Sequence, residues 1–146
     1  MTAAIDNTSA NKDLAKTIAS LLWKGEYDEI ETHLTADHVG HDPMVPEGIG
    51  DVAAMREHFG AMYGAMADVT YEVLDVVAEG DHVFHRGRLS GTHTGELMGV
   101  PATNERLVLD DIIEWRFEDG KLAERWAQYD DVGLMRQLGI ELPGAN

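Results

Sequence analysis

The segment from Leu122 to Asp130 mixes large apolar side chains with polar ones in a pattern that could form a reactive pocket. Side chains alternate between the two faces of a strand. Leu122, Glu124, Trp126, Gln128 and Asp130 would therefore share one face. A core face would not carry Glu, Gln and Asp, and a solvent face would not carry Trp and Leu. The mixture is typical of ligand pockets, which are mostly apolar with a few placed polar groups.

Asp130 is the candidate for proton transfer in this pocket. Burial beside an indole disfavours the charged form of a carboxyl group, which can then act as a general acid or base near neutral pH. A second interpretation is equally open at this point. Asp130 could simply end the strand or cap the helix that follows it.

Histidines supply a second set of candidates. His38 and His41 are three residues apart in a predicted loop, and His82 and His85 are three apart in a predicted strand. The zinc-protease motif needs a spacing of four with an intervening Glu, and His82 and His85 would face opposite sides of their strand. We therefore expect no metal site. His41 is of more interest as a hydrogen-bonding group at a pocket rim.

Arg86 and Arg88 point the same way along one predicted strand and could position a carboxylate or an enolate oxygen. In so acidic a chain, ion pairs with Asp or Glu are the more common use. The segment 91–96 that follows carries His93 between two glycines. Neither the phosphate-loop pattern nor the dinucleotide-binding fingerprint is present, and no Gly-x-Ser-x-Gly turn occurs. We expect no cofactor.

The composition excludes several classes of protein. The chain has 146 residues, no cysteine, and a formal charge of −16. This charge would repel nucleic acids and anionic membranes, and the absence of cysteine excludes disulfides and thiolate chemistry. No apolar run approaches the roughly 20 residues of a membrane helix, and the first residues do not resemble a signal peptide. We therefore expect a cytoplasmic protein.

The elements that must position these residues begin with helices. Residues 1–10 are predicted to be a flexible leader, and residues 11–146 a single domain. A helix follows the leader with Asn11 as a possible cap, and a short helix is predicted over Tyr27 to Leu34. Residues 35–50 are rich in glycine and proline and predict a loop. A third helix follows, capped by Asp51.

Strands are predicted after residue 68. Alternating or continuous bulky residues predict strands over 69–77, 82–90, 107–117 and 122–130, with a long loop over 91–103. Residues 118–121 are typical of a hairpin turn. Asp131 could cap a last helix that ends at Gly139. Helices followed by an antiparallel meander predict an α+β fold.

Several stretches, taken together, resemble the SnoaL-like polyketide cyclase family of the nuclear-transport-factor-2-like superfamily. They run in the family's order over almost the whole chain after the leader. They are His41-Asp42-Pro43, Gly80-Asp81, Arg86, the run from Gly91 to Pro101, Asp119 to Leu122, Glu124 to Trp126, Asp130, Gly133-Leu134 and Gln137 to Gly139.

The resemblance implies a cone in which a curved antiparallel sheet and N-terminal helices enclose a pocket. It also implies a homodimer packed through sheet surfaces and a small hydrophobic ligand that contains a carbonyl group. An aspartate at the position of Asp130 would be the acid/base of an intramolecular aldol ring closure that uses neither cofactor nor metal. The side chains expected to shape and polarise the pocket are His41, Arg86, His93, Glu124, Trp126 and Gln128.

Two departures from the family pattern affect the substrate more than the fold. Residues 101–104 read Pro-Ala-Thr-Asn, and Gly87 stands where an aromatic residue is common, which would leave extra space or loosen the strand. Two other functions therefore stay open. The cone could hold a small hydrophobic ligand without chemistry, or it could hydrolyse an epoxide or isomerise a ketone.

Overall fold

The computed structural model describes residues 6–144. The helices in this range are α1 (Thr8–Lys24), α2 (Tyr27–Glu31), α3 (Val52–Gly64) and α4 (Asp131–Gln137). The strands are β1 (Leu34–His41), β2 (Met66–Glu79), β3 (His82–His93), β4 (Arg106–Glu118) and β5 (Lys121–Tyr129). None of the described helices is long and apolar enough to cross a membrane.

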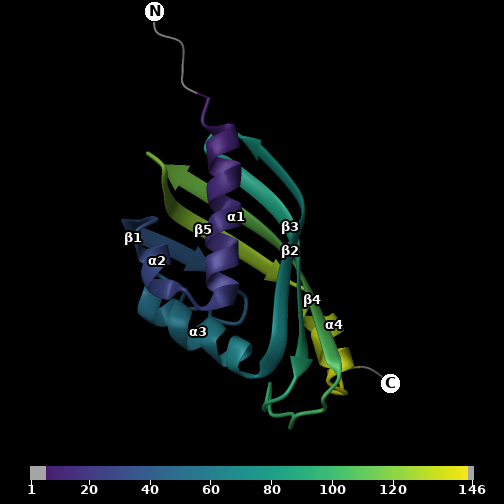
Figure 1. The fold of residues 1–146 in the computed structure, drawn as a ribbon. Coiled ribbons are helices and arrows are strands. Elements are labelled where there is room, and N and C mark those ends of the chain that lie inside the picture. The colour runs from purple at the N-terminus through teal and green to yellow at the C-terminus, as the bar shows by residue number, and fades with distance from the viewer. Residues whose placement is uncertain (1–5, 145–146) are drawn as a thin grey trace, which may run out of the picture.

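The strands form one sheet in the order β1-β5-β4-β3-β2. Strands β2 to β5 are an antiparallel meander, and β1 pairs with β5 in parallel at the edge. Figure 1 shows the long strands curving past α1, with α2 and α3 near one end of that helix and α4 following β5. Helix α1 packs on β2 and β3, so the sheet has a helix-covered inner face and an open outer face.

The structure has strand β1 in part of the segment 35–50, for which the sequence predicts a loop. Its interior positions carry Leu34, His38 and Gly40, so it lacks the apolar alternation by which a strand is recognised. Its parallel partner β5 is distant in sequence, and that pairing leaves no local signal. The predicted helix over 27–34 is correspondingly shorter, because α2 ends at Glu31.

Helix α1 begins earlier than predicted. Its N-cap is Asn7, and Asn11 lies inside the helix, where it is buried. Residues 8–10 of the predicted leader are therefore helical, and residues 1–5 lie outside the described residues. The cap predicted for α3 is confirmed, since Asp51 Oδ1 accepts a hydrogen bond of 2.9 Å from the backbone N–H of Ala54.

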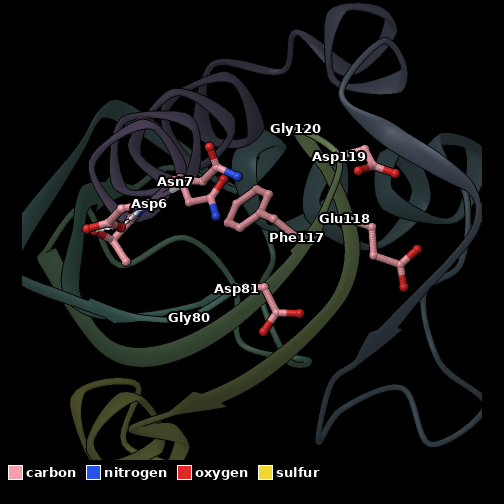
Figure 2. A pocket seen from close by; sticks show the side chains of 10 residues that line it. Asp6, Asn7, Gly80, Asp81, Phe117, Glu118, Asp119 and Gly120 are labelled. Atoms are coloured by element: carbon pink, nitrogen blue, oxygen red, sulfur yellow. Dashed lines mark hydrogen bonds between the residues drawn. The ribbon is translucent and has the colours of Figure 1, made fainter. Parts of the chain in front are cut away.

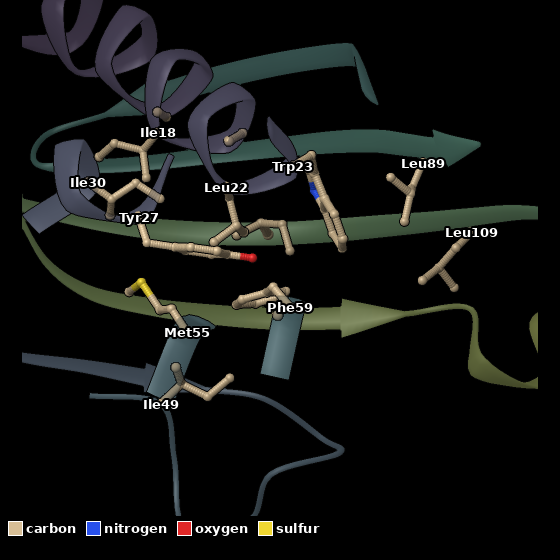
Figure 3. Close-up of a cluster of buried hydrophobic side chains, with 14 of the residues drawn as sticks. Ile18, Leu22, Trp23, Tyr27, Ile30, Ile49, Met55, Phe59, Leu89 and Leu109 are labelled. Atoms are coloured by element: carbon tan, nitrogen blue, oxygen red, sulfur yellow. The ribbon is translucent and has the colours of Figure 1, made fainter. Parts of the chain in front are cut away.

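The core lies between the helices and the inner face of the sheet (Figure 3). Trp23 of α1 packs edge-on against Phe59 of α3, with ring centroids 5.5 Å apart. Leu89 and Leu109 close the core from the sheet side. Burial of such side chains contributes about 1.5–3 kcal/mol each, so this contact stabilises the packing of α1 against α3.

A bulge at the start of β5 reverses the predicted faces of the strand. The turn before it is as predicted, with positive φ at Asp119 (48°) and Gly120 (76°). The register then shifts, so that Leu122 and Ala123 are both buried (0% and 4% exposed). After one extra residue, alternation continues on the opposite face. The side chain of Arg125 therefore points inward, and so do the side chains of every second residue after it in β5.

Helix α4 begins with a different cap from the one predicted. Asp130, not Asp131, is the N-cap, and its Oδ1 accepts a hydrogen bond of 2.9 Å from the backbone N–H of Gly133. A Cβ atom at position 133 would overlap the Asp130 carboxylate, so a glycine is needed there. Asp131 becomes the first residue of the helix, and its side chain takes a different direction from that of Asp130.

Candidate functional site

A cavity of about 180 Å³ lies on the inner side of the sheet, between the helices and the loop that follows β3. Its lining is mostly apolar and includes three methionines. The polar side chains among the lining residues are His58, Tyr129 and Asp131. The lining residues are Trp23, Met44, His58, Phe59, Ala61, Met62, Leu97, Met98, Leu109, Tyr129, Asp131 and Leu134. An apolar cavity with a few polar groups is the usual form of a small-molecule site.

Asp131 brings a carboxyl group to this cavity from the first turn of α4. Burial raises the pKa of Asp131, and the nearby negative charges of Asp42 and Asp130 raise it further. Both causes favour the protonated form. In its protonated form, the Asp131 carboxyl group can give a proton to an oxygen atom in the cavity.

Asp42 and His58 form a pair of polar side chains at the cavity. Asp42 follows β1, and its side chain is almost fully buried (1% exposed). Its Oδ2 atom lies 3.4 Å from His58 Nε2, and its Oδ1 accepts a 2.9 Å hydrogen bond from the backbone N–H of Met44. Burial raises the pKa of Asp42, but these contacts outweigh it and hold the pKa below its ordinary value. The carboxylate is therefore charged and faces the imidazole.

Tyr129 places a phenol at the cavity wall, supported from beneath by Arg125. The Arg125 Nη2 atom donates a hydrogen bond of 3.2 Å to Tyr129 Oη. The guanidinium is buried and lies 5.3 Å from the ring centroid of Trp115 and 5.6 Å from that of Phe59. Burial raises the pKa of Tyr129 to about 12. The phenol therefore keeps its proton and can donate it in a hydrogen bond.

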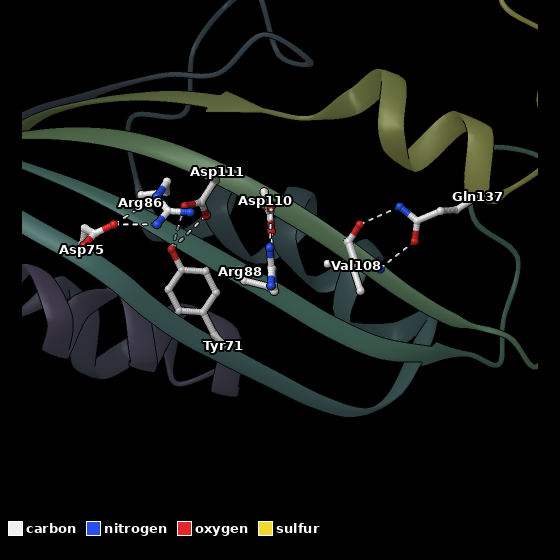
Figure 4. A network of polar contacts seen from close by, with 8 residues as sticks. All are labelled: Tyr71, Asp75, Arg86, Arg88, Val108, Asp110, Asp111 and Gln137. Carbon is white, nitrogen blue, oxygen red and sulfur yellow. Dashed lines mark hydrogen bonds and ion pairs between the residues drawn. The ribbon is translucent and has the colours of Figure 1, made fainter.

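A buried chain of hydrogen bonds lies next to Arg125 on the inner face. Trp115 Nε1 donates to His85 Nδ1 (2.7 Å), so the proton of the imidazole is on Nε2, which contacts Tyr71 Oη at 2.5 Å. The Tyr71 hydroxyl then donates to Asp111 Oδ2 (2.9 Å), as Figure 4 shows. Burial and the Asp111 carboxylate both raise the pKa of Tyr71. Each group has a defined direction, which is typical of networks that fix a core.

The face predicted to enter the pocket lies on the outer side of the sheet instead. His41 Nε2 donates a hydrogen bond of 2.7 Å to Glu124, and the His41 ring stacks on Trp126 at 5.3 Å. Arg116 also donates to Glu124 (3.3 Å). The bulge at Leu122 is the physical reason for this correction.

The other predicted site residues are also outside the cavity. Arg86, Gln128 and Asp130 line a shallow outer groove of about 290 Å³, and Arg86 pairs with Asp75 at 2.6 Å (Figure 4). His93 is fully buried at the end of β3, where its Nδ1 contacts Thr103 Oγ1 at 2.9 Å. The structure thus gathers the predicted residues into two outer clusters and one buried position. Their predicted functional roles remain predictions.

The sequence prediction missed the polar residues of the cavity, although two of them had a signal. His58 lies within the apolar helical pattern of Met55, Phe59 and Met62, which places it near the inner face of α3. Tyr129 shares a face with Arg125, and this face becomes the inner one once the bulge is known. Asp131 had no signal beyond its position beside Asp130.

A larger depression of about 600 Å³ lies at the other end of α1, beside the turns of the two hairpins (Figure 2). Carboxylates from Asp6, Asp81, Glu118 and Asp119 surround it. Among residues 6–144, no three His, Cys, Asp or Glu side chains are grouped as they would be to hold a metal ion. Polar walls of this kind do not suit an apolar ligand, so we place the candidate site in the smaller cavity.

Comparisons with known proteins identify the family to which the sequence is similar. The model of a family described as SnoaL-like polyketide cyclase matches residues 12–138. The aklanonic acid methyl ester cyclase DnrD of Streptomyces peucetius is 25% identical over 142 residues, covering 92% of this chain and 94% of DnrD.

The chain is also similar to several proteins of solved structure. AclR from Streptomyces galilaeus, a proposed hydroxylase, is 29% identical with a TM-score of 0.80, covering 93% of this chain and 99% of AclR. IdmH from Streptomyces antibioticus, a proposed polyketide cyclase, is 27% identical with a TM-score of 0.76, covering 89% of this chain and 99% of IdmH. The resemblance and the α+β fold predicted from the sequence are confirmed.

Proposed function

This chain belongs to the SnoaL-like polyketide cyclase family, and we propose that it closes a ring in a small hydrophobic carbonyl compound by cofactor-independent aldol chemistry. The observation that carries the proposal is a carboxyl group in a mostly apolar cavity, Asp131, whose pKa burial raises. A phenol, Tyr129, lines the same cavity.

The chemistry needs only proton transfer. An activated methylene group of the ligand loses a proton, and the resulting enolate carbon attacks a carbonyl carbon of the same molecule. The carbonyl oxygen then takes a proton from the Asp131 carboxyl group, while the Tyr129 hydroxyl can donate a hydrogen bond to the developing charge. One C–H bond breaks, and one C–C and one O–H bond form, so the product is an isomer of the substrate.

We propose a polyketide-derived keto ester as the substrate class, because the relative DnrD is named for a reaction of aklanonic acid methyl ester. The cavity of about 180 Å³ is smaller than the roughly 300–1,000 Å³ of typical small-molecule sites. Only the reacting end of a polycyclic ligand would enter it. Met44, Met62 and Met98 line the cavity, and flexible methionines adapt to ligand shape.

Two neighbouring carboxyl groups compete for the role of acid. The sequence predicts Asp130, whereas Asp131 lines the cavity and Asp130 caps α4. Asparagine caps helices about as well as aspartate. The variants Asp130→Asn and Asp131→Asn therefore remove one carboxylate each while leaving the start of the helix intact.

The test incubates each variant with aklanonic acid methyl ester and separates the cyclised isomer by chromatography. We expect Asp131→Asn to lower kcat by about 10²-fold or more, the usual contribution of a general acid, and Asp130→Asn to stay close to wild type. Wild-type activity should fall as the pH rises through the raised pKa of Asp131, because the proton donor is then lost. The opposite ranking of the variants would assign the acid to Asp130.

The same incubation distinguishes the other functions. A keto ester that stays bound in native mass spectrometry but is never converted would support a ligand-binding protein. A product that has gained an oxygen atom would support hydroxylation, the reaction proposed for AclR. Either result would contradict the cyclase proposal.

We also propose that two copies pair through the outer face of the sheet. Apolar side chains stand exposed there, with Val77 (64% exposed) beside Phe84 (42%) across β2 and β3, and Ile112 (57%) on β4. Rims of paired charges such as Arg88 with Asp110 (2.7 Å) surround them. An apolar centre with a polar rim is the usual composition of a dimer interface.

A further inference from the structure

We propose that His58 is the base that removes the methylene proton, and that Asp42 is the residue that positions its ring. The inference rests on the proposed function, in which Asp131 is the acid and no residue had been assigned to remove the proton.

His58 lies where such a base is needed. Its side chain lines the cavity together with Tyr129 and Asp131, and it keeps 28% of its surface exposed. No other histidine is among the described residues that line this cavity. A ligand whose carbonyl oxygen meets Asp131 would therefore have other atoms within the cavity that His58 also lines.

Two contacts bear on the orientation of the ring. Its Nε2 faces Asp42 Oδ2 at 3.4 Å, and its plane packs at 74° to the ring of Phe59, with centroids 4.8 Å apart. Asp42 is fixed in turn by the hydrogen bond from the backbone N–H of Met44. A carboxylate at Nε2 favours the tautomer with the proton on Nε2. The lone pair is then on Nδ1, as an aspartate fixes the tautomer of a catalytic histidine.

Each of the other buried histidines, His38, His85 and His93, has a structural partner at Nδ1. His85 accepts from Trp115 at Nδ1 and contacts Tyr71 at Nε2. His38 uses Nδ1 to donate to the backbone carbonyl of Gly50 (2.9 Å). These partners account for the presence of the three histidines, whereas His58 lines the cavity and has a buried carboxylate 3.4 Å from its Nε2.

Two side chains are sufficient for the proton transfers of this reaction. His58 Nδ1 takes the methylene proton, the enolate carbon bonds to the carbonyl carbon, and Asp131 gives its proton to the carbonyl oxygen. The imidazolium and the Asp131 carboxylate that result are both returned to their starting forms when one proton passes between them. The charged or titratable groups around His58 are Asp42, Asp131, Tyr129 and, behind Tyr129, Arg125.

Exchange of the methylene protons in D₂O separates the base from the acid. The keto ester of the previous test is followed by NMR, and the rate without protein is subtracted. Wild type and Asp131→Asn should both speed exchange, while only wild type closes the ring. In His58→Gln, the rates of proton exchange and of ring closure should both fall by at least about 10²-fold. The control His82→Gln, which removes a histidine paired with Glu114 (2.8 Å) on the outer face, should change neither.

Asp42→Asn tests the positioning role with a readout that folding alone would not move. Nitrogen-15 NMR of the His58 ring should show the Nε2–H tautomer in wild type and a mixture in this variant. Its kcat should fall at least about tenfold, while KM is little changed.

Exchange at the wild-type rate in folded His58→Gln, or an unchanged tautomer in Asp42→Asn, would overturn the inference and leave the Asp131 proposal standing. A wild-type protein that neither exchanges nor cyclises the keto ester would overturn both proposals.

Discussion

Gly87 illustrates how much a single residue can determine in this fold. The sequence suggested that a glycine here would leave extra space or loosen the strand. In the structure Gly87 stands between Val73 of β2 and Asp111 of β4, and the Tyr71 hydroxyl occupies the space above it. The glycine therefore allows the buried hydrogen bond from Tyr71 to Asp111.

Gly87→Ala should consequently destabilise the protein. The added Cβ would overlap the Tyr71 hydroxyl and lie 2.7 Å from Asp111 Oδ1. We expect the free energy of unfolding to fall by about 1–3 kcal/mol, the usual cost of overpacking, as measured by urea denaturation.

Gly60→Ala is the matched control for this prediction. Gly60 lies in α3, and the nearest atom to its added Cβ is Tyr27 Oη at 3.9 Å, an ordinary contact. Alanine in a helix is favoured over glycine by about 0.5–1 kcal/mol, so this variant should be as stable as wild type or more so. Equal stability of both variants would show that Tyr71 can move away without cost.

At the residue scale, the acid predicted from the sequence lies one position from the carboxyl group that lines the cavity. It placed an acid at the junction of the last strand and helix, and the cavity does have a carboxyl group there. It chose Asp130 over Asp131 because alternation was counted from Leu122. An error of one residue exchanges the faces of a strand, and no pattern within β5 shows the bulge that causes it.

Elements were predictable where their signals are local. The hairpin turn, the cap of α3 and the periods of α1 and β2 to β4 are encoded by neighbouring residues, and the structure has each of them. Strand β1 was missed because its stability comes from pairing with a distant strand. Leu34 is its one buried hydrophobic residue and Val39 is exposed, so no apolar alternation distinguishes it from a loop.

The start of α4 can be tested as an element. Asp130→Ala removes the hydrogen bond to the backbone N–H of Gly133, and it should lower the free energy of unfolding by about 1 kcal/mol, the typical cost of a lost cap. Asp130→Asn should cost much less, because asparagine can accept the same bond. Thermal denaturation at neutral pH would compare them, and an equal loss in both would mean that the negative charge matters more than the cap.

The whole molecule is a strongly acidic cone whose outer face is less polar than its charge suggests. The chain carries a formal charge of −16, yet Phe84 and Ile112 stand exposed on the outer face. The proposed dimer would bury these side chains while bringing two like-charged subunits together. Hydrophobic contact and repulsion should therefore oppose each other in its assembly.

Salt should strengthen this dimer. Raising the salt concentration from about 0.01 M to about 0.1 M shortens the screening length from about 30 Å to about 10 Å. Repulsion between the subunits weakens, while apolar contact is unaffected. Sedimentation equilibrium should then give a lower dissociation constant at the higher salt concentration.

Ile112→Arg should dissociate the dimer at both salt concentrations, because it places a charge within the apolar patch. Tyr63→Arg adds the same charge on α3, where Tyr63 is 42% exposed, and should leave the dimer intact. A dimer that tolerates Ile112→Arg would show that the subunits pair through another surface.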